Sequence, residues 1–97
     1  EPGAPVIVSF ALTPPVIPVE ASSPVVTWAV DVSGGGTVEL TGPGLLLTAP
    51  TGTQAVCPGA VQGGVCISPP GTYDYVLHAY DDTGAEVDVR TMTLTVQ

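Results

Sequence analysis

The sequence predicts an all-β protein, a sandwich of about seven short strands. Runs in which every second residue is apolar recur along the chain, a pattern typical of strands with one buried face. Twelve glycines and eleven prolines separate these runs with turn signals. No stretch keeps an apolar period of 3.6 residues, and glycine or proline interrupts almost every window of helical length.

Length and composition predict one compact domain over residues 1–97. The chain has 97 residues, of which 44% are hydrophobic, enough for one modest core and too few for two. Only 10% of the residues are charged, whereas disordered chains combine low hydrophobicity with high net charge. The many glycines and prolines therefore indicate turns in a folded domain.

The chain is strongly acidic. Nine acidic residues and a single basic one, Arg90, give a formal net charge of −8. One cation cannot neutralise a row of phosphates, so we expect no nucleic-acid partner. An anionic membrane surface would repel the chain as well. We interpret the acidity as a means of keeping a Val- and Thr-rich domain soluble, with a cation-binding surface as the alternative.

No segment is long enough to insert directly into a membrane. The longest apolar runs, such as residues 45–47, are far shorter than the roughly 20 residues that a membrane helix needs. The chain begins at Glu1 without a methionine or a signal-like segment. We therefore expect a processed protein or a piece of a longer one, with any targeting segment or anchor outside these residues.

Three segments of the first third are expected to be extended. Residues 5–10 form a β-branched run with a proline at its start, which suits an edge strand. The prolines that follow limit residues 16–19 to an extended piece along a sheet edge. Residues 24–31 form a strong strand, with Trp28 in the middle of its apolar face.

The middle of the chain is predicted to contain shorter strands. Residues 37–41 alternate between apolar and polar side chains. Residues 45–48 form either a short strand or a loop packed on the core. Residues 53–57 and 65–68 are interpreted as the two strands of a hairpin whose long tip consists of turn formers and small residues.

The clearest element is a hairpin at the end of the chain. Its first strand places Tyr73, Tyr75 and Leu77 on one face, and a turn at Gly84 leads into a Val- and Thr-rich second strand. We predict that Trp28, Tyr73, Tyr75 and Leu77 belong to the core. Tyr73 also resembles a tyrosine corner, in which the hydroxyl group reaches back to a nearby backbone group.

The second strand of this hairpin contains a conflict of parity. Val87 and Val89 fall on the opposite face from the apolar residues that close the chain. A bulge near Arg90 and Thr91 would reconcile them. The alternative, in which Val87 and Val89 face outward, would point two carboxylates inward and bury charge, so the bulge is preferred.

Four segments carry a resemblance to a known family. Residues 5–10, 25–30, 70–84 and 91–96 follow one another along the chain in the order of that family's strands. Residues 70–84 supply a Pro-Gly-Thr-Tyr start of the penultimate strand and an Asp-x-x-Gly hairpin, and residues 91–96 supply a Thr/Val closing strand. This layout is similar to that of bacterial immunoglobulin-like and PKD-like domains. The resemblance implies an immunoglobulin-like Greek-key β-sandwich of about seven strands, used in secreted or surface proteins as a spacer, an adhesive unit or an accessory to an enzyme. The segment between the two cysteines departs from this pattern.

Cys57 and Cys66 are the two cysteines of the chain. Their spacing does not fit a C-x₂-C metal knuckle, and His78 cannot complete four zinc ligands with them unless carboxylates join. We predict a disulfide that closes the hairpin between them, with free buried thiols as the alternative. A disulfide implies an oxidising location: extracellular, periplasmic or at the cell surface.

Four carboxylates near the last turn are weak candidates for calcium ligands: Asp81, Asp82, Glu86 and Asp88. They do not follow the D-x-[DN]-x-[DN]-G loop, and hard cations need six or more well-placed oxygens. Asp82-Thr83-Gly84 is first of all a turn. The preferred interpretation is a solvated hairpin tip, so no metal or other cofactor is predicted.

Asp74, His78 and Tyr80 share the face that points away from the core. A histidine beside a tyrosine resembles an acid/base pair, but the sequence has no G-x-S-x-G elbow, no activated cysteine and no carboxylate dyad in a pocket. We therefore expect no enzyme. Carbohydrate recognition needs exposed aromatic platforms, and Tyr80 is the one candidate, so a glycan ligand is a minor alternative.

The expected role is that of a non-catalytic structural, spacer or adhesion domain within a larger secreted or cell-surface protein. Its expected partners are neighbouring domains of the same chain or another surface protein. The alternative is a ligand-binding accessory module, for protein or carbohydrate, attached to an extracellular enzyme.

Overall fold

The computed structural model describes residues 5–32, 34–43 and 45–97. Eleven strands run through the described residues: β1 (Val6–Thr13), β2 (Val16–Ile17), β3 (Glu20–Ala21), β4 (Val25–Asp31), β5 (Thr37–Gly42), β6 (Leu45–Leu47), β7 (Thr51–Ala55), β8 (Ala60–Gln62), β9 (Val65–Ile67), β10 (Gly71–Tyr80) and β11 (Glu86–Val96). The all-β prediction is confirmed. The strands outnumber the predicted seven because five of them have only two or three residues. Over the described residues, no helix is of a kind that could cross a membrane.

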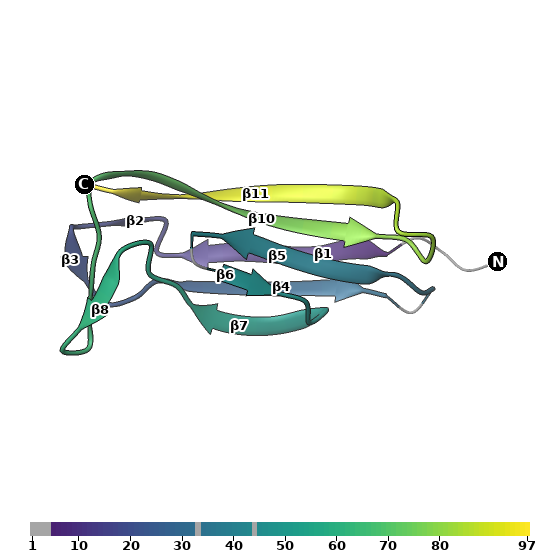
Figure 1. Ribbon diagram of the computed structural model, residues 1–97, viewed down its shortest axis with the longest axis horizontal. Helices are drawn as coiled ribbons and strands as arrows, with labels where there is room; N and C mark the ends of the chain where they lie inside the picture. Colours follow the sequence, from purple (N-terminus) through teal and green to yellow (C-terminus); the bar gives the residue numbers. More distant parts are fainter. Residues whose placement is uncertain (1–4, 33, 44) are drawn as a thin grey trace.

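The strands form three sheets in an elongated molecule (Figure 1). One sheet has the order β1-β4-β7, and a larger one has the order β2-β11-β10-β5-β6. Buried side chains from both sheets make one hydrophobic cluster, as expected of a sandwich. A small third sheet, β3-β9-β8, lies near one end of the molecule, whose extents are 49 × 21 × 18 Å.

The start of the chain contributes an edge strand to each of the two larger sheets. β1 pairs antiparallel with β4, and β2 pairs parallel with β11. Only Pro14 and Pro15 separate the two strands. The prediction of an edge strand followed by an extended edge segment is therefore confirmed, although β1 continues to Thr13, beyond the expected end at residue 10.

β4 alternates as its sequence predicts. Val26, Trp28 and Val30 are buried, whereas Val25 and Thr27 on the other face are exposed. Trp28 lies in the core at 3% exposure, and its indole Nε1 donates a hydrogen bond of 2.8 Å to the carbonyl oxygen of Ala49. The indole is thus fixed at its polar end by the backbone between β6 and β7.

β10 and β11 form the longest antiparallel pair, with a regular register from Gly71 opposite Val96 to Ala79 opposite Asp88. The irregularity lies beyond this point, because Tyr80 pairs with Glu86 and Val87 is skipped. The predicted bulge near Arg90 and Thr91 is therefore wrong.

The prediction of a bulge near Arg90 failed because this segment of β11 lies at the margin of its sheet. Val87 and Val89 face outward, at 41% and 47% exposure. Asp88 and Arg90 have inward parity, yet their side chains keep 37% and 51% exposure. At this margin, a side chain on the core-facing side of the strand therefore still reaches solvent, and its charge is not buried.

The predicted hairpin of residues 53–57 with residues 65–68 is also wrong. β7 pairs with β4, while β9 pairs with β8 and with β3. Gly63 and Gly64 form the two-residue turn between β8 and β9, with φ values of 60° and 80° that favour glycine. The segment interpreted as a loop therefore contains a strand of its own.

Candidate functional site

The predicted disulfide between Cys57 and Cys66 is present and joins the segment that follows β7 to β9. Ser68 lies beside it, fully buried, with its Oγ 3.3 Å from the Sγ of Cys66. The same Oγ accepts a hydrogen bond of 3.1 Å from the backbone N–H of Gly59. The disulfide and Ser68 thus tie the β8–β9 hairpin to the sandwich, and a disulfide of this kind is typical of oxidising compartments.

Asp81 organises the turn between β10 and β11. One carboxylate oxygen, Oδ1, accepts hydrogen bonds from the Thr83 hydroxyl at 2.6 Å, the Thr83 amide at 2.9 Å and the Ala85 amide at 3.0 Å. These donors, the Thr83 hydroxyl first, lower the pKa of Asp81 below its ordinary value. The carboxylate therefore shapes the turn.

The other calcium candidates have separate partners. Glu86 contacts His78, and Asp88 accepts a hydrogen bond from the Val89 amide at 2.8 Å. Asp82 is exposed on the turn. Within the described part of the chain, no group of three or more His, Cys, Asp or Glu side chains is placed to hold a metal ion. The structure therefore does not bring the four carboxylates together.

His78, Tyr80 and Glu86 form a cluster on the outer face of the five-stranded sheet. His78 Nδ1 lies 2.5 Å from Glu86 Oε1. The rings of His78 and Tyr80 stack, with centroids 6.0 Å apart and planes 14° apart. Glu86 reaches this face because the register shift at Val87 places it opposite Tyr80. The sequence placed His78 and Tyr80 on one face but named Glu86 only as a calcium candidate and not as their neighbour, for which the parity conflict was the available signal.

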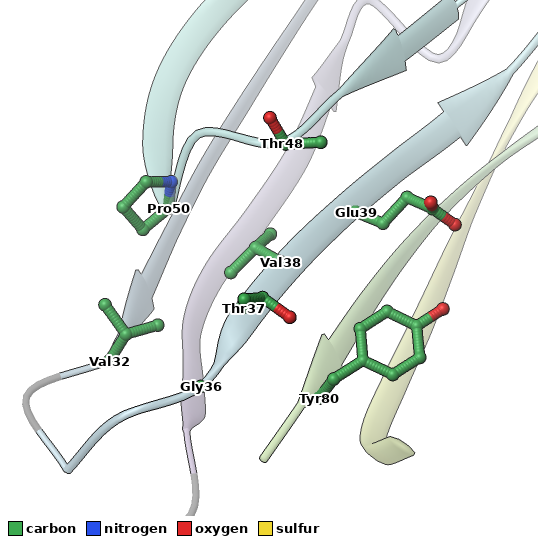
Figure 2. A pocket seen from close by; sticks show the side chains of 8 residues that line it. All are labelled: Val32, Gly36, Thr37, Val38, Glu39, Thr48, Pro50 and Tyr80. Atoms are coloured by element: carbon green, nitrogen blue, oxygen red, sulfur yellow. The ribbon is translucent and has the colours of Figure 1, made fainter. Parts of the chain in front are cut away.

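A pocket of about 410 Å³ lies beside this cluster (Figure 2). Tyr80 and Glu39 line one side of the pocket, and Val32 and Pro50 lie across from them. Thr37 and Thr48 add hydroxyl groups to the lining. The pocket therefore combines an aromatic ring, a carboxylate and hydroxyls with apolar carbon, a lining suited to a small polar ligand.

Desolvation and two nearby carboxylates act on the hydroxyl group of Tyr80. Desolvation of the half-buried Tyr80 ring, and then the negative charges of Glu39 and Glu86, raise the pKa of the Tyr80 hydroxyl above its ordinary value. The hydroxyl therefore remains a neutral hydrogen-bond donor. Nothing in the sequence placed Pro50 or Val32 across a pocket from Glu39.

The predicted core residues lie along the interior of the sandwich. Tyr75 and Leu77 are fully buried, and Tyr73 is half-buried. The Tyr73 hydroxyl donates a hydrogen bond of 2.7 Å to the carbonyl oxygen of Pro69, the geometry of a tyrosine corner. The Tyr75 hydroxyl is buried and has no hydrogen-bond partner among the described residues, and desolvation raises its pKa.

The candidate acid/base pair lies outside the pocket. His78 and Glu86 lie on an exposed sheet face, with side chains 24% and 43% exposed, and neither lines the pocket. Asp74, predicted on the same face, accepts a hydrogen bond from Thr93 instead of joining them. No protein-family model matches the chain, and no curated protein matches it in sequence.

Proposed function

We propose that this chain is a non-catalytic spacer or adhesion domain of immunoglobulin-like type within a larger secreted or cell-surface protein. The strand order supports the immunoglobulin-like topology, because β1-β4-β7 faces β2-β11-β10-β5-β6 and the chain passes repeatedly between the two sheets. The hydrogen bond from Tyr73 to Pro69 at the start of β10 is a further supporting feature. The disulfide supports an extracellular or cell-surface location.

The observation that carries the spacer role is the placement of the first and last strands. β1 begins at one end of the 49 Å long axis, and Gln97 lies at the other end (Figure 1). A domain that the chain enters at one end and leaves at the other adds its full length to an array of domains. Neighbouring domains of the same chain, or another surface protein, are then the partners.

The connection between the terminal segments suits a load-bearing unit. β2 runs parallel to β11, held by hydrogen bonds from the Thr95 amide to the Pro15 carbonyl at 2.9 Å and from the Gln97 amide to the Ile17 carbonyl at 3.0 Å. Tension along the long axis pulls these two strands past each other. Both hydrogen bonds must then break together rather than one after the other.

Small-angle X-ray scattering of one, two and three copies joined in tandem tests the spacer role. We expect the largest dimension to grow with each copy by roughly the length of the domain, because the ends lie far apart. A single-copy sample supplies the reference. Tandem proteins whose largest dimension grows by only the 21 Å width of the domain would contradict the proposal.

The pocket beside Tyr80 favours a second candidate, a ligand-binding accessory module for protein or carbohydrate. Binding to glycan and peptide arrays should be compared between the wild type and a double variant, His78→Ala with Tyr80→Ala. Val61→Ala, on the exposed β8, is the matched control. Binding that the double variant loses while it remains folded would support the module, and no binding by any of the three proteins would support the spacer.

A further inference from the structure

β11 is an edge strand over most of its length. Among the described residues, only β2 pairs with its outer side, and β2 reaches no further than Thr95 and Val96. Toward the right of Figure 1, β11 forms the upper margin of the molecule. An edge of this kind presents backbone N–H and C=O groups to which another strand can add.

The odd-numbered amides of β11 point toward this free side. The amides of Thr95 and Gln97 donate to β2, on the side away from β10. The register with β10 is regular from Asp88 to Val96, so the alternation of a β-strand places the amides of Val89, Thr91 and Thr93 on the same side. The Val89 amide agrees with this, because it donates to the Asp88 carboxylate and not to β10.

The charges on this edge are complementary to a second copy of the same edge. Arg90 is the single cation of the chain. It lies on β11 two residues from Asp88, with Nη2 4.0 Å from Asp88 Oδ2 and with both side chains partly exposed. The two residues flank Val89 symmetrically. An antiparallel pairing with its two-fold axis at Val89 therefore places each Asp88 opposite the Arg90 of the other copy.

We propose that β11 pairs antiparallel with β11 of a second copy of this chain, centred on Val89, to form one continuous sheet across a two-fold dimer. Val89 then exchanges backbone hydrogen bonds with its counterpart, and Asp88 releases the Val89 amide to contact Arg90 of the other copy. The regular part of β11, from Asp88 onward, supplies the paired residues. This self-association is separate from the spacer role and does not depend on it.

Other registers of the same two strands lack this complementarity. An axis at Arg90 would place two guanidinium groups opposite each other, which destabilises a strand pair. An axis at Thr91 would place Arg90 opposite Met92 and leave both charges without a partner in the other copy. The competing explanation is that Asp88 and Arg90 are charges that protect the edge from any pairing, and it predicts a monomer at every concentration.

Sedimentation equilibrium of the oxidised protein, from about 10 μM to about 1 mM, tests the proposal. We expect the wild type to dimerise in this range. Asp88→Arg and Arg90→Asp should each weaken dimerisation at least about tenfold, because each replaces two attractive cross-strand pairs by two repulsive ones. Glu20→Arg on β3 makes the same change of charge as Asp88→Arg at a distant strand and should leave dimerisation unchanged.

The decisive experiment is to mix the two single variants. In a mixed dimer, the Asp88→Arg chain carries guanidinium groups at both positions of the pair, and these face the two carboxylates of the Arg90→Asp chain. Association should therefore return to the wild-type level or exceed it. Both variants stay strongly acidic because the chain starts from a net charge of −8, so general attraction does not explain recovery. The variant carrying both exchanges should dimerise like the wild type.

A wild type that stays monomeric throughout the range would overturn the proposal, as would a mixture that associates no more than its components. Circular dichroism checks that each variant is folded. If either single variant loses its sheet signal, Val89→Lys replaces it, because it puts two ammonium groups on the two-fold axis at an exposed position. Dimerisation of Val89→Lys at the wild-type level would likewise overturn the proposal.

Discussion

Replacing Gly42 by alanine should destabilise the protein more than any other single methyl group added to a strand glycine. Gly42 ends β5 and lies against the ring of Tyr75. A Cβ at this position would lie 2.3 Å from Cδ1 and 2.7 Å from Cε1 of that ring, far inside van der Waals contact. Tyr75 is 0% exposed, so the ring cannot move away without displacing other core side chains.

The expected cost follows from these contacts. Overpacking a well-packed core costs about 1–3 kcal/mol, and a fixed aromatic ring at this distance puts Gly42→Ala at the upper end. Alanine also restricts the unfolded chain, which returns about 0.4–1 kcal/mol. We therefore expect a net loss of about 2 kcal/mol in the free energy of unfolding.

Urea unfolding followed by the fluorescence of Trp28 measures this loss. Gly52→Ala is the matched control, because its Cβ would lie 3.0 Å from Cη2 of Trp28, a milder contact. A double-mutant cycle with Tyr75→Leu isolates the ring, since Gly42→Ala should cost much less once the ring is gone. An equal cost of Gly42→Ala in both backgrounds would refute the reasoning, as would a cost no greater than that of Gly52→Ala.

Three further predictions concern the disulfide, the hydroxyl groups of Tyr73 and Tyr75, and the last turn. Replacing Cys57 and Cys66 together by serine should lower the free energy of unfolding by about 2.7 kcal/mol, which is the chain-entropy value for a loop of about ten residues. Urea unfolding measures this loss, and a loss below about 1 kcal/mol would contradict the prediction. Tyr73→Phe should lower the free energy of unfolding by about 0.5–1.5 kcal/mol because it removes the hydrogen bond to Pro69. Tyr75→Phe should leave the free energy of unfolding unchanged or raise it, because it removes a buried hydroxyl without a partner among the described residues. In thermal unfolding, the reverse order of these two variants would show that the assignment of the hydroxyls is wrong. Asp81 has a pKa below its ordinary 3.8 in the folded state, so its contribution to stability is complete above pH 3.8 and is lost as the pH falls through the folded pKa. Asp81→Asn should therefore lower the melting temperature near neutral pH, and its melting temperature should approach that of the wild type in acid. A difference in melting temperature that does not change with pH would exclude a stabilising role of the ionised carboxylate.

The sequence predicts the interior strands of this fold better than its margins. β4 was predictable because Val26, Trp28 and Val30 recur at every second position and all three enter the core. β7 was assigned the wrong partner, residues 65–68, because its residues are mostly exposed and have no apolar alternation that would mark β4 as their neighbour. Pairing at such a position is decided by tertiary contacts rather than by local pattern.

The error at β11 has a related cause. The parity argument assumed that an inward position is a buried one, which holds for Tyr75 and Leu77 in the interior strand β10. At the free edge, Asp88 and Arg90 point inward and still reach solvent, so the expected cost of burying their charges does not arise.

The candidate site was predictable only in part. The alternation of β10 placed His78 and Tyr80 on its outer face, and the structure adds their stacking and the contact of His78 with Glu86. The far wall of the pocket, Val32 and Pro50, comes from loops. Loops that cross between sheets leave no periodic signal in the sequence, so this wall required the three-dimensional structure.

The turn at Gly63 and Gly64 also offers a route to engineering the domain. A Cβ at either glycine would meet no atom within 4 Å, so the space around the turn is open. The hairpin that carries the turn is anchored at its other end by the disulfide and by β3. Exposed loop tips of this kind tolerate insertions. A peptide tag or a fluorophore-binding sequence inserted between the two glycines should therefore leave both large sheets intact and make the domain detectable by fluorescence or by an antibody.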